Sequence, residues 1–464
     1  MKNLWFLDIE NFDSLICTPP GLGELVRLRR LSVFIVGGDA SHEIHQLKEL
    51  NLSGELSIKG LDNVRNLDDA KCANLITKKD LTSLTLSWTN DIKKKPAQHF
   101  AEVLQGLQPH EDLEKICIKS YQGSVLPNWM STLALNKLTQ ITLENCQRCE
   151  HLPSFGQLPF LTCLKLHGMD SIIRLNAELH VQNFPSLESL TIQLCPKLTG
   201  LPKLPSLRTL NISCSSVALL TSITFLTSLT SLKLFDFPEL DVFPGGFLQN
   251  HKALKDLKLG ALPIRTLSNV FGNLPALKTL SLDDCANLEF LPEGLKYLNS
   301  LERLDINRCD SLSSFPATML ESLPSLRWLS FQHCKKLIPL TGSMNRAPAL
   351  QSLLINRLPE LEYLPESLQQ LSGIRVLKIW DCERLCSLPN WLSSLGSLSE
   401  ISIRYCEELK SLPDDFNSQK SLRMLEIKGR PQLEMRCNKP MGEDWPKISD
   451  IPNIIINHQF IQRQ

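Results

Sequence analysis

The chain of 464 residues carries 49 Lys and Arg against 49 Asp and Glu, so its formal net charge is zero. This balance argues against a general binder of nucleic acid or anionic membranes, which carries a basic excess, and no apolar run is long enough to span a membrane. Fifteen cysteines lie along the whole length rather than in a short secreted scaffold, which indicates reduced thiols in a cytosolic protein.

Short strands are predicted at irregular intervals through the first half of the chain. Leucine-bearing segments begin near Leu4, Leu28, Leu81, Leu113, Leu138, Leu161, Leu187, Leu207, Leu229 and Leu254, and a further strand lies around Leu56. Their spacing of 20 to 32 residues predicts connections of variable length. Apolar residues at helical spacing predict helices near residues 66–79 and 97–107, with 41–50 as a third candidate. The basic stretch Asp91–Pro96 between them is interpreted as a solvated loop.

The second half of the chain repeats the pattern L-x-x-L-x-L-x-x-C-x-x-L-x-x-L-P at steps of 24 or 25 residues. The copies start at Leu277, Leu301, Leu326, Leu350, Ile374, Leu398 and Leu422. This period and pattern are those of a leucine-rich repeat. The alternating L-x-L predicts a short strand with inward-facing leucines, which each repeat buries only by stacking on its neighbours. Proline suits the return of the chain, because it fixes φ and has no N–H to satisfy.

The sequence therefore predicts an α/β leucine-rich-repeat solenoid. We expect a curved horseshoe with a parallel β-sheet on its concave face and loops and short helices on its convex face. Residues 1–437 are expected to form about 18 irregular repeats, and residues 438–464 a C-terminal cap or tail.

Pairs of cysteines such as Cys382 and Cys386 suggest a metal site, a redox pair or a reactive thiol. Their position in the repeat favours a structural role, because Cys382 occupies the ninth repeat position. Six other cysteines share that position, namely Cys146, Cys195, Cys285, Cys309, Cys334 and Cys406. We expect these seven to be buried and inert, each acting as a small apolar residue. No second pair at zinc-binding spacing follows Cys146 and Cys149, so neither a metal nor a cofactor is predicted.

No catalytic motif is found in the sequence. The segment His42–His45 reads H-E-x-H, one residue short of the H-E-x-x-H helix motif of zinc proteases, so its histidines would not share the required helix face. A G-x-S-x-G nucleophile motif does not occur. The acidic residues are scattered, and the sequence places no pair of them in one cleft. The chain is therefore predicted not to be an enzyme.

Several long segments resemble one protein family. The segments LVRLRRLSVFIVG, LKELNLSGELSIKGLDNVRNLDDAKCANLITKKDLTSLTLSW, VLQGLQPHEDLEKICIKSYQGSVLPNWM and RCNKPMGEDWPKISDIPNIIIN are similar to the leucine-rich-repeat region of plant NB-LRR disease resistance proteins of the RGA-like, coiled-coil class. The resemblance implies a cytoplasmic immune receptor whose repeats recognise a pathogen effector or a guarded host protein. It also implies that the repeats fold back on a nucleotide-binding switch and hold it inactive.

The chain departs from that family in one respect. It contains no Gly-Lys dipeptide, so the phosphate-binding G-x-x-x-x-G-K-[ST] loop is absent, as is the Met-His-Asp sensor motif. We therefore expect the repeat region alone, without a nucleotide cofactor. Two other classes of protein also carry leucine-rich repeats. A substrate-recognition subunit of a ubiquitin ligase would need an F-box before the repeats, and an extracellular receptor or inhibitor would need a signal peptide and N-x-L-x-G-x-I-P in each repeat.

The repeat also predicts where a partner binds. The third, fifth, seventh and eighth positions of each L-x-x-L-x-L-x-x segment are expected to face outward on the concave side. In the later repeats they give a candidate protein-binding set: Arg303, Asn307, Arg308, Trp328, Gln332, His333, Arg357, Trp380, Arg404 and Tyr405. Aromatic residues beside arginine are typical of interface hot spots and favour an acidic protein partner. Alternatively, Asp305, Asp381 and Glu400 neutralise the arginines within the chain.

Overall fold

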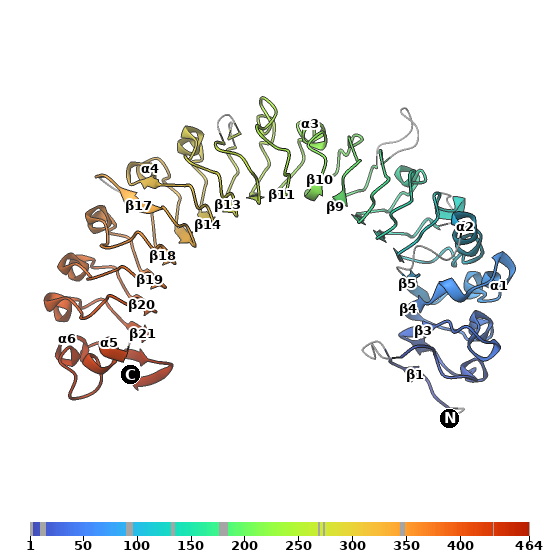
Figure 1. The fold of residues 1–464 in the computed structure, drawn as a ribbon, viewed down its shortest axis with the longest axis horizontal. Coiled ribbons are helices and arrows are strands. Elements are labelled where there is room, and N and C mark those ends of the chain that lie inside the picture. Colours follow the sequence, from blue (N-terminus) through green and yellow to red (C-terminus); the bar gives the residue numbers. More distant parts are fainter. Residues whose placement is uncertain are drawn as a thin grey trace. The chain divides into compact units, whose positions relative to one another are not determined.

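The fold is described from a computed structural model. The described residues are 3–9, 15–89, 96–130, 135–175, 184–267, 270–271, 274–343, 349–429 and 431–463; most of the predicted loop 91–96 lies outside them. The chain divides into two compact units, Met1–Leu229 and Thr230–Gln464, and each is described by itself. Within each unit the strands follow one another along the inner edge of the ribbon, and the helices lie on the outer edge (Figure 1).

Unit 1 contains one parallel sheet whose strands pair in chain order. They are β3 (Val33–Ile35), β4 (Gly54–Lys59), β5 (Leu81–Ser87), β6 (Lys115–Lys119), β7 (Gln140–Glu144), β8 (Cys163–His167), β9 (Ser189–Cys195) and β10 (Thr209–Ser215). Before them, β1 (Phe6–Leu7) pairs in parallel with β2 (Arg30–Leu31). The strands lie where the leucine pattern predicts them, because alternation places one side-chain row in the core.

The helices of unit 1 only partly follow the sequence prediction. The helix predicted over 97–107 is α2 (Ala97–Gly106). The helix predicted near 66–79 is wrong in extent: α1 covers only Leu67–Lys71, because Asn74 turns left-handed at φ 50° and a separate 3₁₀ turn, Leu75–Thr77, follows. The candidate at 41–50 forms two 3₁₀ turns, Ala40–His42 and Ile44–Leu47, rather than an α-helix. A further helix, α3 (Leu219–Ile223), follows β10.

Unit 2 contains a second parallel sheet in chain order. Its strands are β11 (Ser231–Phe235), β12 (Asp256–Gly260), β13 (Thr279–Asp283), β14 (Arg303–Asn307), β16 (Trp328–Gln332), β18 (Ser352–Asn356), β19 (Val376–Trp380), β20 (Glu400–Arg404) and β21 (Met424–Lys428). On the return side, β15 (Ser314–Pro316) pairs with β17 (Ile338–Thr341). The helical turns there are α4 (Thr318–Glu321) and the 3₁₀ turns Glu293–Tyr297, Glu366–Gln370, Asn390–Ser394 and Asp414–Ser418. All four of these 3₁₀ turns begin after the repeat's Leu-Pro.

The last residues close the edge of the second sheet. After α5 (Pro431–Arg436) and α6 (Trp445–Ile448), β22 (Asn453–Ile456) pairs in parallel with β21, and β23 (Gln459–Gln462) folds back on it antiparallel. The fully buried carboxylate of Asp444 accepts hydrogen bonds from Arg436 Nε at 3.0 Å and from the Leu412 backbone N–H at 3.1 Å. This edge therefore ends in an antiparallel hairpin rather than an open parallel strand, which limits pairing with other chains.

The predicted burial of the cysteine row is confirmed. All seven ninth-position cysteines are buried, and Cys386 is exposed. Each thiol lies where the strand turns; the Cys382 Sγ, for example, donates a 3.4 Å hydrogen bond to the Trp380 carbonyl. Burial raises the pKa of Cys382 to about 11, so its thiol is protonated at neutral pH. Among the described residues there is no cluster of three metal-ligating side chains, and no helix is both long and apolar enough to cross a membrane.

Candidate protein-binding face

Strand pairing places the candidate binding residues in rows on unit 2. Strands β14 to β20 pair without a register shift, so Asn307, Gln332, Asn356, Trp380 and Arg404 are lateral neighbours in the seventh-position row. Arg303 and Trp328 are neighbours in the third-position row. Adjacent strands lie about 4.8 Å apart, so side chains of one row are within contact distance of each other. The structure thus brings the predicted residues onto one face.

Trp328 is held in place by two neighbours. The guanidinium of Arg303 stacks 4.6 Å from the centre of its indole ring. The same guanidinium donates to both carboxylate oxygens of Asp305, at 2.6 and 3.1 Å, and the Trp328 Nε1–H donates to Asp305 at 3.0 Å. Asp305 therefore neutralises Arg303 within the chain, which is the alternative that the sequence offered to binding of an acidic partner. The indole of Trp328 is half-buried rather than fully exposed.

Trp380 has an equivalent arrangement two strands away. Arg404 stacks 4.6 Å from its ring centre and donates to both oxygens of Glu426, at 2.7 and 2.8 Å. The Trp380 Nε1–H donates to the Ser402 hydroxyl at 2.9 Å, and that hydroxyl donates to Glu426 at 2.7 Å. Burial raises the pKa of Glu426, but the hydrogen bonds from Arg404 and Ser402 outweigh burial and leave the pKa below its ordinary value.

Sequence analysis missed Glu426 as a member of this face. It is the fifth residue of the repeat that starts at Leu422, so the same positional rule would have found it. The candidate set ended with the repeat at Leu398, and strand β21 pairs directly with β20 of that repeat. Applying the positional rule to the last repeat as well would have supplied the missing partner of Arg404.

The eighth-position residues behave differently from the rest of the face. Arg308, His333, Arg357 and Tyr405 have φ between 51° and 55°, in the left-handed region. In the same row Asp284 (φ 55°) precedes Arg308, and Asp381 (φ 50°) lies between Arg357 and Tyr405. Their backbone N–H groups donate to the next strand, as in the 2.9 Å bond from His333 to the Asn356 carbonyl. In a strand, successive side chains point to opposite faces of the sheet. The left-handed residue at the eighth position interrupts this alternation, so the seventh and eighth side chains both face outward.

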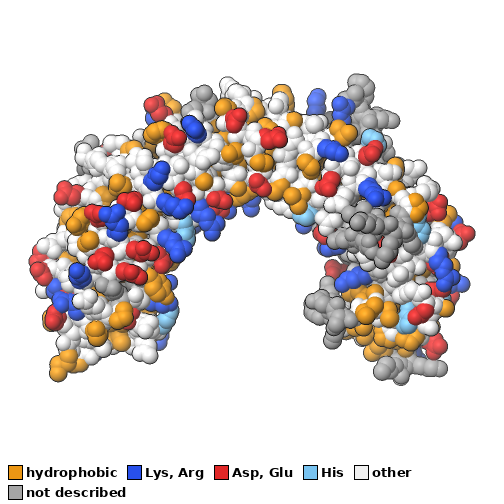
Figure 2. All heavy atoms as spheres, in the orientation of Figure 1, with side chains coloured by type: hydrophobic (Ala, Val, Ile, Leu, Met, Phe, Trp, Pro, Cys, Tyr) orange, Lys and Arg blue, Asp and Glu red, His pale blue; other side chains and the backbone are white. Residues whose placement is uncertain are grey.

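Side chains of this row line a cavity of about 510 Å³ at the strand ends. Its wall contains Asp284, Arg308, Asp310, His333, Lys335, Arg357, Pro359, Asp381 and Glu383. Lys335 pairs with Asp310 at 2.5 Å. Within the described ranges, the guanidinium groups of Arg308 and Arg357 form no ion pair or hydrogen bond. Figure 2 shows Lys and Arg side chains gathered on the inner edge of unit 2.

His333 lies between these two arginines in the row. Burial lowers its pKa, and the charges of Arg357 and Arg308 lower it further, while Asp381 opposes them. The pKa therefore lies below the ordinary value of 6.5, and the imidazole is neutral at neutral pH. A neutral imidazole has one N–H to donate and one nitrogen that accepts.

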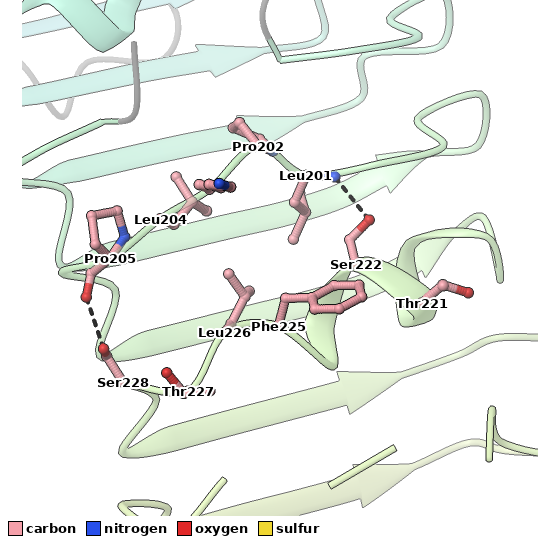
Figure 3. A pocket seen from close by; sticks show the side chains of 11 residues that line it. Leu201, Pro202, Leu204, Pro205, Thr221, Ser222, Phe225, Leu226, Thr227 and Ser228 are labelled. Carbon is pink, nitrogen blue, oxygen red and sulfur yellow. Dashed lines mark hydrogen bonds between the residues drawn. The ribbon is translucent and has the colours of Figure 1, made fainter. Parts of the chain in front are cut away.

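A second cavity, of about 670 Å³, lies in unit 1 and contains none of the predicted residues (Figure 3). Leu201–Pro205 line one side of it, and Thr221, Ser222 and Phe225–Ser228 line the other. The repeat that starts at Leu187 has only 20 residues, and its return segment Leu201–Pro205 forms no helix. Because the segment Leu201–Pro205 is short, it leaves the neighbouring side chain of Phe225 77% exposed. This cavity is mainly apolar, with Lys203 the charged residue in its lining.

Comparison with known proteins identifies the family. Residues 44–169 match the family model of R13L1/DRL21 leucine-rich repeats, and residues 248–427 match that of plant disease resistance protein RPS2-like leucine-rich repeats. The disease resistance protein RGA1 of Solanum bulbocastanum is 34% identical over 308 residues, which cover 66% of this chain and 29% of that protein. The chain is a leucine-rich-repeat region of the RGA-like plant disease resistance family.

Two further relatives support this placement, and two solved structures support the fold. RGA2 of the same species is 31% identical over 304 residues, covering 64% of this chain and 27% of that protein. The RPP13-like protein 1 of Arabidopsis thaliana is 30% identical over 335 residues. The chain therefore spans about a third or less of these relatives. A leucine-rich-repeat protein of Leptospira interrogans and the TLR13–ssRNA13 complex superpose with TM-scores of 0.53 at 20% and 19% identity, which supports the fold alone.

Proposed function

We propose that this repeat region recognises a protein in plant defence, either a pathogen effector or a guarded host protein, through the face of unit 2 formed by β14 to β21. The observation that carries the proposal is the pair Arg308 and Arg357, whose charges have no partner within the described chain although they lie on the same face as two fixed indoles. The RGA-like relatives support the role in plant immunity.

The indoles of Trp328 and Trp380 support a docking role because their positions are fixed before a partner arrives. Each is stacked under an arginine and hydrogen-bonded through its Nε1–H. A rigid aromatic side chain loses little conformational entropy on binding, which favours its use as an anchor. Arg303 and Arg404 already have carboxylate partners, so on this proposal they orient the indoles rather than recruit the partner.

The two arginines of the face that have no ion-pair partner among the described residues favour an acidic partner. Arg308 and Arg357 are exposed, and each offers a planar set of N–H donors that matches a carboxylate. Favourable pairing with a partner's carboxylates would accelerate encounter and fix orientation. The nucleotide-binding domain of a full-length receptor is the second candidate occupant, because the resemblance implies that the repeats fold back on that domain.

We further propose that recognition proceeds without catalysis and within the cytoplasm. The carboxylates of this face that lie nearest the indoles, Asp305 and Glu426, are each engaged by an arginine and so are poorly placed to move protons. All fifteen cysteines are free thiols, which supports a reducing compartment. The RGA-like relatives support the same setting.

Site-specific photocrosslinking in leaf tissue tests the docking face. A benzophenone amino acid replaces Tyr405, which is 41% exposed on the proposed face, or Tyr297, which is 61% exposed on the return side. We expect one defined protein adduct from position 405 and none from position 297, and loss of the adduct when Arg308 and Arg357 are both changed to Glu. Equal adducts from both positions, or an adduct that the charge reversal leaves unchanged, would contradict the proposed face.

A further inference from the structure

The cavity at the strand ends carries an unusual order of charges. Along the eighth-position row, Asp284 is followed by Arg308, His333, Arg357 and Asp381, each from the next repeat of the sheet. The two cationic groups are therefore separated by one neutral imidazole and enclosed by a carboxylate at each end. With strands about 4.8 Å apart, Arg308 and Arg357 are roughly 10 Å apart at the backbone, a gap that two long side chains can bridge toward one group.

The two arginines are available although acidic side chains stand beside them. Asp284 and Asp381 are lateral neighbours in the same row, but within the described residues neither forms an ion pair with Arg308 or Arg357. Elsewhere on this face arginines do pair with nearby carboxylates, Arg303 with Asp305 and Arg404 with Glu426. The side chains of both arginines line the cavity instead of pairing with a carboxylate on the strand face.

The chemistry of the row favours a compact anion over an extended acidic segment. A run of acidic side chains laid along the row would meet Asp284 at one end and Asp381 at the other, and like charges would repel. A single carboxylate is already satisfied by one bidentate arginine. A phosphate monoester has three acceptor oxygens and close to two negative charges, so it accepts from two guanidinium groups and one imidazole N–H at once.

We propose that the cavity of Arg308, His333 and Arg357 binds a phosphate monoester carried by a phosphorylated segment of a partner protein. Arg308 and Arg357 would each donate two hydrogen bonds to the phosphate oxygens, and His333 would donate one between them. Asp284 and Asp381 would exclude longer polyanions. This inference rests on the proposed function, since it names the chemical group that the docking face recognises.

The test uses the full 464-residue chain and three peptides of seven residues. Their flanking residues are uncharged and identical, and the central residue is phosphoserine, glutamate or serine. Binding is measured by fluorescence anisotropy of the labelled peptides at pH 7.5. We expect the phosphoserine peptide to bind at least tenfold more tightly than the glutamate peptide, and the serine peptide not to bind. Arg308→Gln and Arg357→Gln should each weaken binding at least tenfold, and Arg308→Lys should restore part of the loss, because it keeps the charge but not the bidentate geometry.

Arg327→Gln is the matched control, because Arg327 is an exposed arginine directly before β16 that does not line the cavity. It removes the same charge and should leave binding unchanged. A second readout is the ring resonance of His333 in histidine-labelled protein, assigned by its loss in His333→Asn. Bound phosphate should raise the pKa of His333, which the charges of Arg357 and Arg308 lower and the charge of Asp381 raises in the free protein.

The outcomes separate this inference from the proposed function. Equal binding of the phosphoserine and glutamate peptides would overturn the phosphate inference, and an adduct from position 405 would still support docking of an acidic protein. Inorganic phosphate or a nucleotide that binds as tightly as the phosphopeptide would also overturn it, because the site would then take a free anion. An equal loss of binding in Arg327→Gln would assign the effect to overall charge and would contradict the cavity as the site.

Discussion

Arg404 lies over the indole of Trp380 at 4.6 Å from the ring centre, and the same distance separates Arg303 from the indole of Trp328. In both cases the guanidinium also holds a carboxylate of the same sheet with two hydrogen bonds. The two clusters therefore make a rigid platform of aromatic rings from residues whose charges cancel. Arg308 and Arg357, which form no ion pair with the described residues, lie one position beyond the strands.

Removing the carboxylate of Glu426 tests the Trp380 cluster. Glu426→Gln should destabilise the fold by about 1 kcal/mol at pH 7, because Arg404 loses the charged acceptor of two hydrogen bonds from one of its terminal nitrogens. The folded pKa of Glu426 is lowered, so the stabilisation is present above its unfolded pKa of about 4.5 and is lost as the pH falls through the folded value. Denaturant unfolding of both proteins between pH 3 and 7 measures the difference, which should disappear at the acidic end.

The exposed pair of Arg384 with Glu362 provides the control for Glu426. Both side chains are about half exposed, so Glu362→Gln should change stability by only a few tenths of a kcal/mol. If Glu426→Gln and Glu362→Gln lower the free energy of unfolding equally, the ion pair beside Trp380 is no more stabilising than an exposed surface pair, which would contradict this prediction.

Lys78 gives a prediction for alkaline pH. Its buried Nζ donates to the carbonyls of Leu47 and Leu50, both at 2.7 Å, and burial lowers its pKa from 10.5 to about 8. Between those pH values the unfolded chain binds a proton that the folded chain does not, so folded stability should rise as the pH increases through this window. Lys78→Gln cannot titrate, and Gln419 already makes the equivalent pair of bonds to Leu392 and Leu395.

The measurement for Lys78 is the unfolding free energy of the parent minus that of Lys78→Gln between pH 7.5 and 10.5. This difference should grow in favour of the parent with increasing pH. A difference that is flat or decreases would show that the lysine is not desolvated in the folded state.

The cysteines give a prediction of reactivity. Cys285, Cys309, Cys334, Cys382 and Cys406 are buried, whereas Cys72 and Cys386 are exposed. In the native protein, iodoacetamide should modify Cys72 and Cys386 within minutes and should leave the buried five unmodified until denaturant is added. Peptide mapping by mass spectrometry measures each site. Stoichiometric zinc that is lost in a Cys382→Ser, Cys386→Ser variant would contradict the structural interpretation of these thiols.

Nucleotide binding gives a further prediction. The sequence lacks a G-x-x-x-x-G-K-[ST] loop, whose backbone N–H groups and lysine hold phosphates in nucleotide-binding domains. The purified chain should therefore show no micromolar affinity for ADP or ATP in calorimetry. Micromolar binding that survives Arg308→Gln and Arg357→Gln would reveal a nucleotide site that the repeat pattern does not predict.

The sequence was sufficient to predict the strands and the buried cysteine row, because both occupy fixed positions of a repeat whose leucines are buried only by stacking. It was not sufficient for the helix near 66–79, where the left-handed Asn74 ends α1 after five residues. The carboxylate partners of the arginines were predicted only in part: Asp305 was among the expected neutralising residues, and Glu426 was not. Asp305 accepts hydrogen bonds from Arg303, and Glu426 accepts them from Arg404. Which carboxylate pairs with which arginine depends on the geometry of the side chains, and the repeat pattern does not contain that geometry.

The central claim is that the face of β14 to β21 docks a protein, and Trp328 and Trp380 test it most directly. For the partner recovered by crosslinking from position 405, calorimetry should compare the parent with Trp328→Ala, Trp380→Ala and the control Trp391→Ala, which alters a 3₁₀ turn on the return side. We expect each of the first two changes to cost about 2 kcal/mol of binding with the far-ultraviolet circular dichroism unchanged, and the control to cost nothing. Unchanged affinity in both Trp328→Ala and Trp380→Ala would contradict the account and place the docking site elsewhere on the chain.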